Sequence, residues 1–218
     1  MSYNVAIDGP AGAGKSTIAK RIARRLGYIY VDTGAMYRAM AYYLIQNQVD
    51  AADKEAIAAA CQHADISICY QDGEQVVLLN GENVNAYLRT EAVGNMASVS
   101  SVVPEVRKKL VELQQKLARE TDVVMDGRDI GTVVLPDADV KVYLTASVET
   151  RAKRRFLELE EKGEPAELAR IAADIEDRDY RDMHRDISPL RQAEDATLVD
   201  SSNMTIDQVV ERILELCR

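Results

Sequence analysis

Short apolar segments alternate with longer segments of helical periodicity along most of this 218-residue chain. The apolar segments have the length of strands and lie at residues 3–8, 28–32, 122–126, 140–144 and 196–199. Apolar residues recur at helical spacing between them, which predicts helices at 18–26, 33–44, 51–62, 90–101, 104–120, 147–162, 165–183 and 206–216. This alternation is typical of a parallel sheet with helices on both faces, so an α/β fold is predicted.

The pattern changes between residues 65 and 89. Ile66, Ile68 and Tyr70 alternate with polar neighbours, which predicts a half-buried strand. Asp72-Gly73 and Asn80-Gly81 are turn signals on either side of a second strand at 76–79, and a third strand is expected within 83–87. The segment is therefore predicted to be a small antiparallel insert in the α/β chain.

Composition excludes several classes of protein. With 47% apolar and 29% charged residues, no apolar run of membrane length and no leader-like start, a cytoplasmic protein without a membrane partner is expected. The net charge of −9 argues against a broad nucleic-acid-binding face. A zinc site is not expected, because Cys61 and His63 are close but two ligands do not make a site, and the remaining cysteines and histidine are scattered.

The most specific pattern is the loop Gly9-Pro10-Ala11-Gly12-Ala13-Gly14-Lys15-Ser16, which fits the G-x-x-x-x-G-K-[ST] pattern of the P-loop. Its glycines let backbone N–H groups curl around an anion, and the following helix directs its positive end there. Lys15 can reach the β- and γ-phosphates, and the Ser16 hydroxyl can bind Mg²⁺. The flanking strand and helix disfavour a chance glycine-rich turn.

A P-loop alone predicts only a nucleoside triphosphate. The Asn-Lys-x-Asp base-reading motif of a GTPase does not occur in the sequence, and a motor usually needs a longer chain. A kinase needs a second anion site, and Arg38 and Arg128 are candidates because each follows a strand end and a glycine. Surface ion pairs are the alternative for both.

Two charged segments follow. The first is a group of four cations, here called the basic cluster: Arg151, Lys153, Arg154 and Arg155. They lie near the start of a predicted helix, where the helix dipole disfavours positive charge. This favours a lid that closes over the phosphates, and the alternative is a solvated helix face balanced by glutamates. In 177–186, spacing places Arg178, Asp182 and Arg185 on one face, and composition alone favours a salt-bridged helix.

Together these residues resemble the bacterial-type cytidylate kinases, of the nucleoside monophosphate (NMP) kinase group of P-loop kinases, over nearly the whole chain. The resemblance is carried by Ile7-Asp8-Gly9-Pro10 with the P-loop, by Asp32 to Arg38, by Asp126-Gly127-Arg128-Asp129-Ile130-Gly131-Thr132-Val133-Val134, and by 178–185 with Ser188-Pro189-Leu190.

The resemblance implies a P-loop kinase fold in a single domain of residues 1–218, with a five-stranded parallel sheet flanked by helices. The core would comprise 1–62, 103–146 and 192–218. A small antiparallel β insert in the NMP-binding region would lie at about 63–102, a helical lid at about 147–165, and a substrate-binding helix at 166–186.

The resemblance also implies residue roles. Ser98, Arg107 and Asp129 would read cytosine, since a carboxylate accepts from the cytosine amino group and repels the carbonyl of uracil. Arg178 and Asp182 would contact the sugar, whereas Arg38, Arg128 and Arg185 would hold the acceptor phosphate beside Thr33 and Tyr37. The ATP-binding set is Gly9, Pro10, Ala11, Gly12, Ala13, Gly14, Lys15, Ser16, Thr17, Arg151 and Arg154. The catalytic set is Lys15, Arg128, Arg154 and Arg155.

The expected reaction is therefore MgATP plus CMP or dCMP to ADP plus CDP or dCDP, by a monomer in pyrimidine nucleotide metabolism. Spacing favours Ser16 as the metal ligand, although some relatives have Gly-Lys-Gly-Thr here and Thr17 stays open. Alternatives are a kinase for UMP, AMP or a metabolite hydroxyl, with Asp8 or Asp32 as base, and a nucleotide-dependent switch without transfer activity.

Overall fold

The computed structural model describes residues 2–71 and 73–217, which form two compact units. One unit, called here the loop unit, comprises Tyr3–Ile29 and the described residues from Asp122 onward. The other, called the insert unit, comprises Ser2 and Tyr30–Thr121. The insert unit thus contains the whole of the predicted insert at 63–102 together with the flanking helices.

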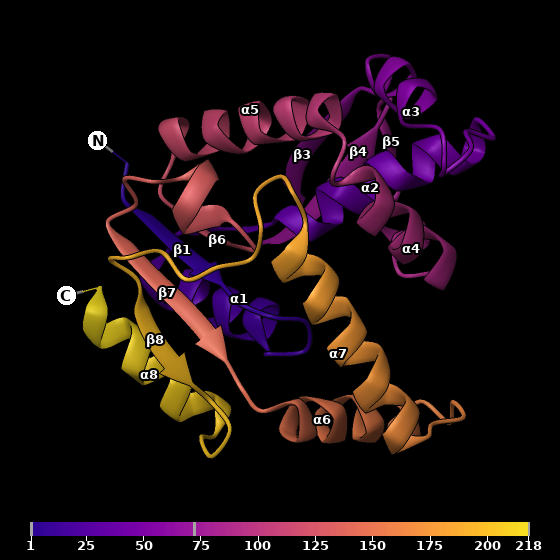
Figure 1. The fold of residues 1–218 in the computed structure, drawn as a ribbon. Helices are drawn as coiled ribbons and strands as arrows, with labels where there is room; N and C mark the ends of the chain where they lie inside the picture. Colours follow the sequence, from indigo (N-terminus) through magenta and orange to yellow (C-terminus); the bar gives the residue numbers. More distant parts are fainter. Residues whose placement is uncertain (1, 72, 218) are drawn as a thin grey trace. The chain divides into compact units, whose positions relative to one another are not determined.

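The main sheet is five-stranded, with the order β2-β6-β1-β7-β8 (Figure 1). β1 (Asn4–Asp8) pairs in parallel with β6 (Val123–Gly127) and with β7 (Val140–Thr145), and β7 pairs in parallel with β8 (Thr197–Asp200). β2 is Ile29–Asp32. The central strands are buried because they carry continuous apolar runs, such as Val5-Ala6-Ile7 and Val123-Val124-Met125. The predicted parallel sheet is confirmed.

Four helices belong to the loop unit. They are α1 (Lys15–Leu26), α6 (Val148–Glu161), α7 (Leu168–His184) and α8 (Ile206–Leu216). α1 packs against α8, and α6 against α7. α1 ends where predicted, because Gly27 takes the left-handed conformation, with φ +73°, that a C-terminal cap needs.

The insert unit has four helices and a small antiparallel sheet. The helices are α2 (Thr33–Gln46), α3 (Lys54–Cys61), α4 (Glu91–Ser100) and α5 (Pro104–Glu120). The sheet, in the order β3-β4-β5, consists of β3 (Ile66–Gln71), β4 (Glu74–Leu79) and β5 (Glu82–Asn83). The side chain of Asp53 caps α3 by accepting from the N–H of Ala56 at 2.9 Å. The predicted β meander is confirmed, and its first turn signal falls partly on Asp72, outside the described residues.

The third strand exists, but its expected extent within 83–87 was wrong. β5 is only Glu82–Asn83, and the chain then forms the 3₁₀ turn η1 (Asn85–Tyr87). Asn85 explains this, because its side chain donates to the Gln75 carbonyl and accepts from the Val77 N–H, at 2.9 and 3.0 Å. A side chain that forms these hydrogen bonds with the backbone of β4 competes with the backbone hydrogen bonds that a longer β5 would form.

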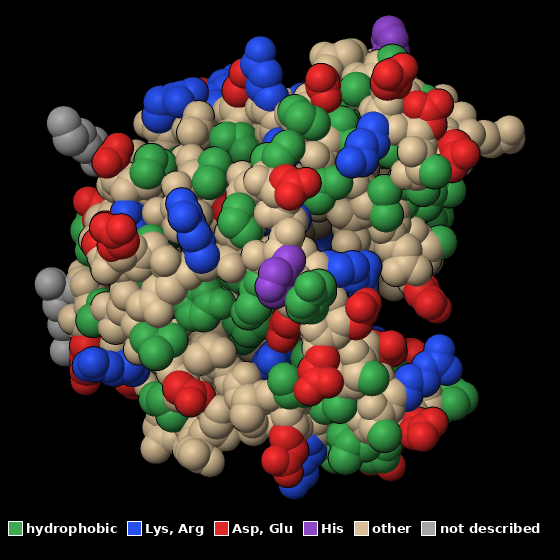
Figure 2. All heavy atoms as spheres, in the orientation of Figure 1, with side chains coloured by type: hydrophobic (Ala, Val, Ile, Leu, Met, Phe, Trp, Pro, Cys, Tyr) green, Lys and Arg blue, Asp and Glu red, His purple; other side chains and the backbone are tan. Residues whose placement is uncertain are grey.

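A single π-helical turn, η2 (Ile130–Val134), follows β6 and is not predicted by the sequence pattern. Such turns are rare in proteins, and those that occur often lie at functional sites. Among the described helices, none combines the length and the apolar character needed to cross a bilayer. Basic and acidic side chains are interspersed on the face that Figure 2 shows.

Two glycine substitutions test how the loop unit and α4 are built. Gly9 has φ +150°, and a Cβ there would lie 1.9 Å from the Leu144 carbonyl oxygen, so Gly9→Ala is expected to destabilise by more than about 3 kcal/mol. Gly94, inside α4, has no atom within 4 Å of an added Cβ, so Gly94→Ala is expected to stabilise by about 0.5–1 kcal/mol. Thermal melts compare them, and a Gly9→Ala variant as stable as the parent would show that β7 does not exclude a side chain at position 9.

Candidate functional site

The glycine loop lies between the end of β1 and the start of α1, as the sequence predicts. Gly12 and Gly14 have φ of +73° and +88°, a region that side chains disfavour. Gly14 is the N-terminal cap of the twelve-residue α1, so Lys15, Ser16 and Thr17 form its first turn. The loop and the positive end of α1 together form the anion-binding geometry of a P-loop.

Lys15 is buried at the base of the loop. Its exposed fraction is 6%, and its Nζ donates to the Pro10 carbonyl at 2.8 Å. Burial, followed by the nearby guanidinium of Arg128, lowers the pKa of the Lys15 ammonium to about 7. A charged phosphate group next to it would favour the protonated form and reverse this shift.

Ser16 and Asp126 form the oxygen-donor pair that fits Mg²⁺. The Ser16 hydroxyl donates to the Asp126 carboxylate at 3.2 Å, and Asp126 is buried near the end of β6, next to β1. Mg²⁺ is usually held by one or two carboxylate or hydroxyl oxygens, with phosphate oxygens and water in the remaining positions. The donor set therefore fits the metal, and the contact supports Ser16 as the hydroxyl ligand.

Asp8 joins the glycine loop to the turn that carries Asp129. Its two carboxylate oxygens accept from the N–H groups of Ile130 and Gly131, at 2.8 and 2.7 Å. Burial raises the pKa of Asp8 to about 6, while these two N–H groups favour its charged form. An added Cβ at Gly131 would lie 3.2 Å from Lys141 Cδ and 3.4 Å from the Asp8 carboxylate, so a side chain at position 131 would be a tight fit beside Asp8.

A second group of charges lies in the same unit, where β6 ends and α7 ends. Arg128 Nε donates to Asp182 at 2.8 Å, and Arg185 lies 3.7 Å from the Asp129 carboxylate. Burial alone would raise the pKa of Asp182, but the guanidinium of Arg128 holds it below its usual range. The structure therefore brings four of the predicted substrate residues into two ion pairs. Arg178 is on α7 and is exposed.

The basic cluster is divided among different partners. α6 begins at Val148, with Glu149 in its first turn ahead of the four cations. Arg151 is buried against Asp179, at 2.6 Å, whereas Arg154 donates to the hydroxyl and carbonyl of Ser201, at 3.2 and 2.8 Å. Arg155 pairs on the helix surface with Glu158, at 2.9 Å. Roles of Arg151, Arg154 and Arg155 at a phosphate stay predictions.

The insert unit carries the other predicted substrate residues. Arg38 pairs with Asp32 at 3.1 Å, and the same carboxylate caps α2 through the N–H of Ala35 at 2.8 Å. The guanidinium of the buried Arg107 lies 5.7 Å from the centre of the Tyr37 ring, within the range of a cation–π contact. Thr33 is the buried first residue of α2, and Ser98 is on α4.

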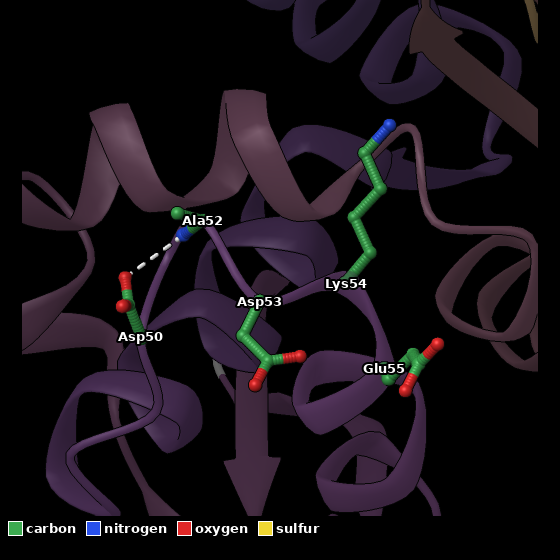
Figure 3. Close-up of a pocket in the computed structure, with 5 residues that line it drawn as sticks. All are labelled: Asp50, Ala52, Asp53, Lys54 and Glu55. Atoms are coloured by element: carbon green, nitrogen blue, oxygen red, sulfur yellow. Dashed lines mark hydrogen bonds between the residues drawn. The ribbon is translucent and has the colours of Figure 1, made fainter.

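A hollow lies at the start of α3 (Figure 3). The described residues that line it are Asp50, Ala52, Asp53, Lys54 and Glu55, and none belongs to the predicted site. Asp50 accepts from the Ala52 N–H at 2.9 Å and Asp53 caps α3, so both carboxylates have local structural roles.

Three carboxylates at the site were missed or misjudged from the sequence. Asp126 and Asp179 were given no role, and Asp8 was considered only as a base for a hydroxyl acceptor. For Asp126, the sequence signal was its place at the end of an apolar strand segment, where parallel sheets concentrate function. No periodicity reveals the bonds of Asp8 and Asp179 to the backbone, since the N–H groups that donate to them are 122 to 168 residues away in the chain.

Comparisons with known proteins agree with this geometry. A family model described as cytidylate kinase matches residues 5–218. A cytidylate kinase of Lactobacillus johnsonii is 54% identical over 212 residues, which cover 97% of this chain and 92% of that protein. One from Caldicellulosiruptor saccharolyticus is 51% identical over 213 residues, covering 98% and 94%.

Among solved structures, that of an uncharacterized protein from Eubacterium ventriosum covers 98% of this chain and 97% of its own, with a TM-score of 0.53. Its sequence identity is 12%, so this likeness concerns the fold alone.

The lowered pKa of Lys15 gives a test of the loop. At about pH 8, Lys15 is mostly neutral before binding, and the phosphates of ADP are already ionised. Binding of ADP is therefore expected to take up a fraction of a proton. At about pH 6, where Lys15 already carries its proton, this contribution is expected to vanish. Calorimetry in two buffers of different ionisation enthalpy measures the uptake.

Lys15→Met is the matched control, because it keeps the stem of the side chain and removes the titrating group. It is expected to abolish the uptake at about pH 8. Proton release at that pH by the parent protein, or equal uptake by the variant, would show that Lys15 is not the group that titrates.

Proposed function

Since the chain belongs to the cytidylate kinase family, we propose that it transfers the γ-phosphate of ATP to CMP or dCMP, giving ADP and CDP or dCDP. Family membership makes the protein a kinase of the nucleoside monophosphate class. The observation that supports the donor half is the glycine loop with Lys15 at the positive end of α1. The proposed partners are MgATP and CMP or dCMP alone, bound by a monomer in the cytoplasm.

The donor would be held by Gly9 to Thr17. Ser16, with Asp126, would hold Mg²⁺, which supplies charge neutralisation for the triphosphate when it is bound. Lys15 is positioned to carry positive charge to the β- and γ-phosphates. Burial and the nearby guanidinium of Arg128 lower the pKa of Lys15, and a bound phosphate would raise it again.

Acceptor-binding roles are proposed for residues of the loop unit and, separately, for residues of the insert unit. In the loop unit, Asp129 would accept from the cytosine amino group, Arg128 and Arg185 would hold the phosphate, and Asp182 and Arg178 the sugar. In the insert unit, Ser98 and Arg107 would contact the base and Arg38 the phosphate, with Thr33 and Tyr37 beside it. The ion pairs Arg128–Asp182 and Arg185–Asp129 support this assignment, because they fix the guanidinium groups next to the carboxylates that would read base and sugar.

In the transfer step, an oxygen of the acceptor phosphate would form a bond to the γ-phosphorus as the bond to the β,γ-bridging oxygen breaks. ADP leaves with the bonding electrons. The attacking oxygen is already ionised, so no general base is needed, and catalysis is positioning plus charge stabilisation. Arg128 and Lys15 would supply positive charge. Arg154 and Arg155 would contribute only by exchanging their Ser201 and Glu158 partners for phosphate.

A kinase with a hydroxyl acceptor is disfavoured by the carboxylates. Such a reaction would want Asp8 or Asp32 as a base. Both oxygens of Asp8 accept from the turn η2, and Asp32 caps α2 and pairs with Arg38. Both carboxylates already have structural hydrogen-bond partners, which disfavours either of them as the base.

A panel of acceptors tests the proposal. The rate of ADP formation from MgATP is measured with CMP, dCMP, UMP and AMP, and with no acceptor. We expect strong stimulation by CMP or dCMP and weaker stimulation by UMP and AMP. Stimulation by none of the four would contradict the function, and a preference for UMP or AMP would contradict the assigned acceptor.

Arg128 is the strongest single candidate for a catalytic arginine. Arg128→Ala is expected to lower kcat/KM by about 10³-fold, because a cation that neutralises transferring phosphate is lost, while ADP binding survives. Arg181→Ala is the control, since Arg181 is exposed on α7 and pairs only at the surface with Asp177. Equal turnover in the two variants would remove Arg128 from the mechanism.

Asp129 is expected to determine the base. Asp129→Asn can donate to the carbonyl of uracil, so the ratio of kcat/KM for CMP over UMP is expected to fall by about tenfold or more. Arg185 would also lose its 3.7 Å partner, and a loss for both substrates is therefore expected. An unchanged ratio would show that another group reads the base.

A further inference from the structure

Asp179 differs from the other acidic residues of α7. Its side chain is 11% exposed, whereas the side chain of Asp177, two positions earlier, is 69% exposed. Asp177 pairs with Arg181 along the helix surface. Asp179 instead faces the glycine loop, and the mechanism above gives it no role.

The carboxylate of Asp179 closes a ring of bonds around Ala11. One oxygen accepts from the Ala11 N–H at 3.2 Å, and the other accepts from Arg151 Nη1 at 2.6 Å. The same Arg151 nitrogen donates to the Ala11 carbonyl at 2.8 Å, and Arg151 Nε donates to the Ala146 carbonyl at 2.9 Å. Both backbone groups of Ala11 are therefore held by one buried ion pair.

This ring fixes the part of the loop that precedes the phosphate-facing turn. An added Cβ at Gly12 would lie 3.4 Å from Arg151 Cβ, so the arginine packs directly along the loop. Ala11 and Arg151 are both buried. Held peptide groups keep the loop in its binding conformation before the nucleotide arrives, which reduces the ordering cost of binding.

We propose that Asp179 is a positioning residue for the donor nucleotide, which acts through Arg151 and the backbone of Ala11 and touches no substrate. The proposal rests on the proposed function for the identity of the donor, ATP. It also changes the interpretation of Arg151: this arginine holds the loop and is not a phosphate ligand.

The direction in which the affinity for a nucleotide changes in an Asp179 variant separates positioning from simple electrostatics. Asp179→Asn removes one negative charge near the loop and leaves Arg151 buried without its counterion. If charge alone mattered, the variant would bind an anionic nucleotide more tightly. If the ring positions the loop, the variant binds it more weakly, because the amide cannot hold both Ala11 and Arg151 as the carboxylate does.

Equilibrium binding of ADP to the full chain provides the test, because it needs no acceptor and no turnover. We expect Asp179→Asn to raise the Kd for ADP by about tenfold, because the loop then has to be ordered when the nucleotide binds. Asp177→Asn, on the same helix and exposed, is expected to leave the Kd unchanged. An unchanged or lower Kd in Asp179→Asn would overturn the proposal.

A double variant separates positioning from loss of folding. Asp179→Asn with Arg151→Met removes both buried charges, so the fold no longer contains an unpaired cation. We expect the double variant to melt at a higher temperature than Asp179→Asn and still to bind ADP weakly, since Ala11 is no longer held. Recovery of the parent Kd would show that the pair only balances charge. Failure of CMP to act as acceptor would contradict the proposed function and leave this result standing.

Discussion

The structure depends on how buried cations are balanced around a glycine loop. Lys15 and Arg151 are both more than nine-tenths buried, although a buried charge is costly unless it is paired and hydrogen-bonded. The loop itself contributes no carboxylate, so the partners come from other elements. Arg151 is balanced by Asp179 of α7, and Lys15 is left with the Pro10 carbonyl and a lowered pKa. An anion bound at the loop would complete this balance.

The same constraint explains how a protein of net charge −9 can be built for polyanionic substrates. Its positive charge is local, and the arginines proposed to hold phosphate are paired with carboxylates in the free protein. Arg38 pairs with Asp32, Arg128 with Asp182, and Arg185 with Asp129. These carboxylates keep each guanidinium group ordered, so less side-chain entropy would be lost when phosphate binds.

Much of the fold could be predicted from the sequence because its signals are local. The apolar strand segments, the cap at Gly27 and the glycine loop depend on residues within a few positions of one another. The short β5, the π-helical turn η2 and the role of Asp179 could not, because each depends on hydrogen bonds that periodicity does not encode. Asn85 folds back on β4, Asp8 reaches a turn 122 residues later, and Asp179 reaches Ala11. The basic cluster shows the opposite error. Its cations lie close together in the sequence, which suggests one shared role, but Arg151, Arg154 and Arg155 have different partners in the structure.

The glycine loop is proposed to present the donor phosphate to a cytidine monophosphate, and the roles proposed for the acceptor-binding residues depend on that transfer. The decisive experiment follows the radiolabelled γ-phosphate of ATP in a mixture with CMP and Mg²⁺. We expect the label to appear in CDP, with little in inorganic phosphate. Label found only in inorganic phosphate, or retained in ATP while the protein is folded and binds ADP, would contradict the proposed transfer.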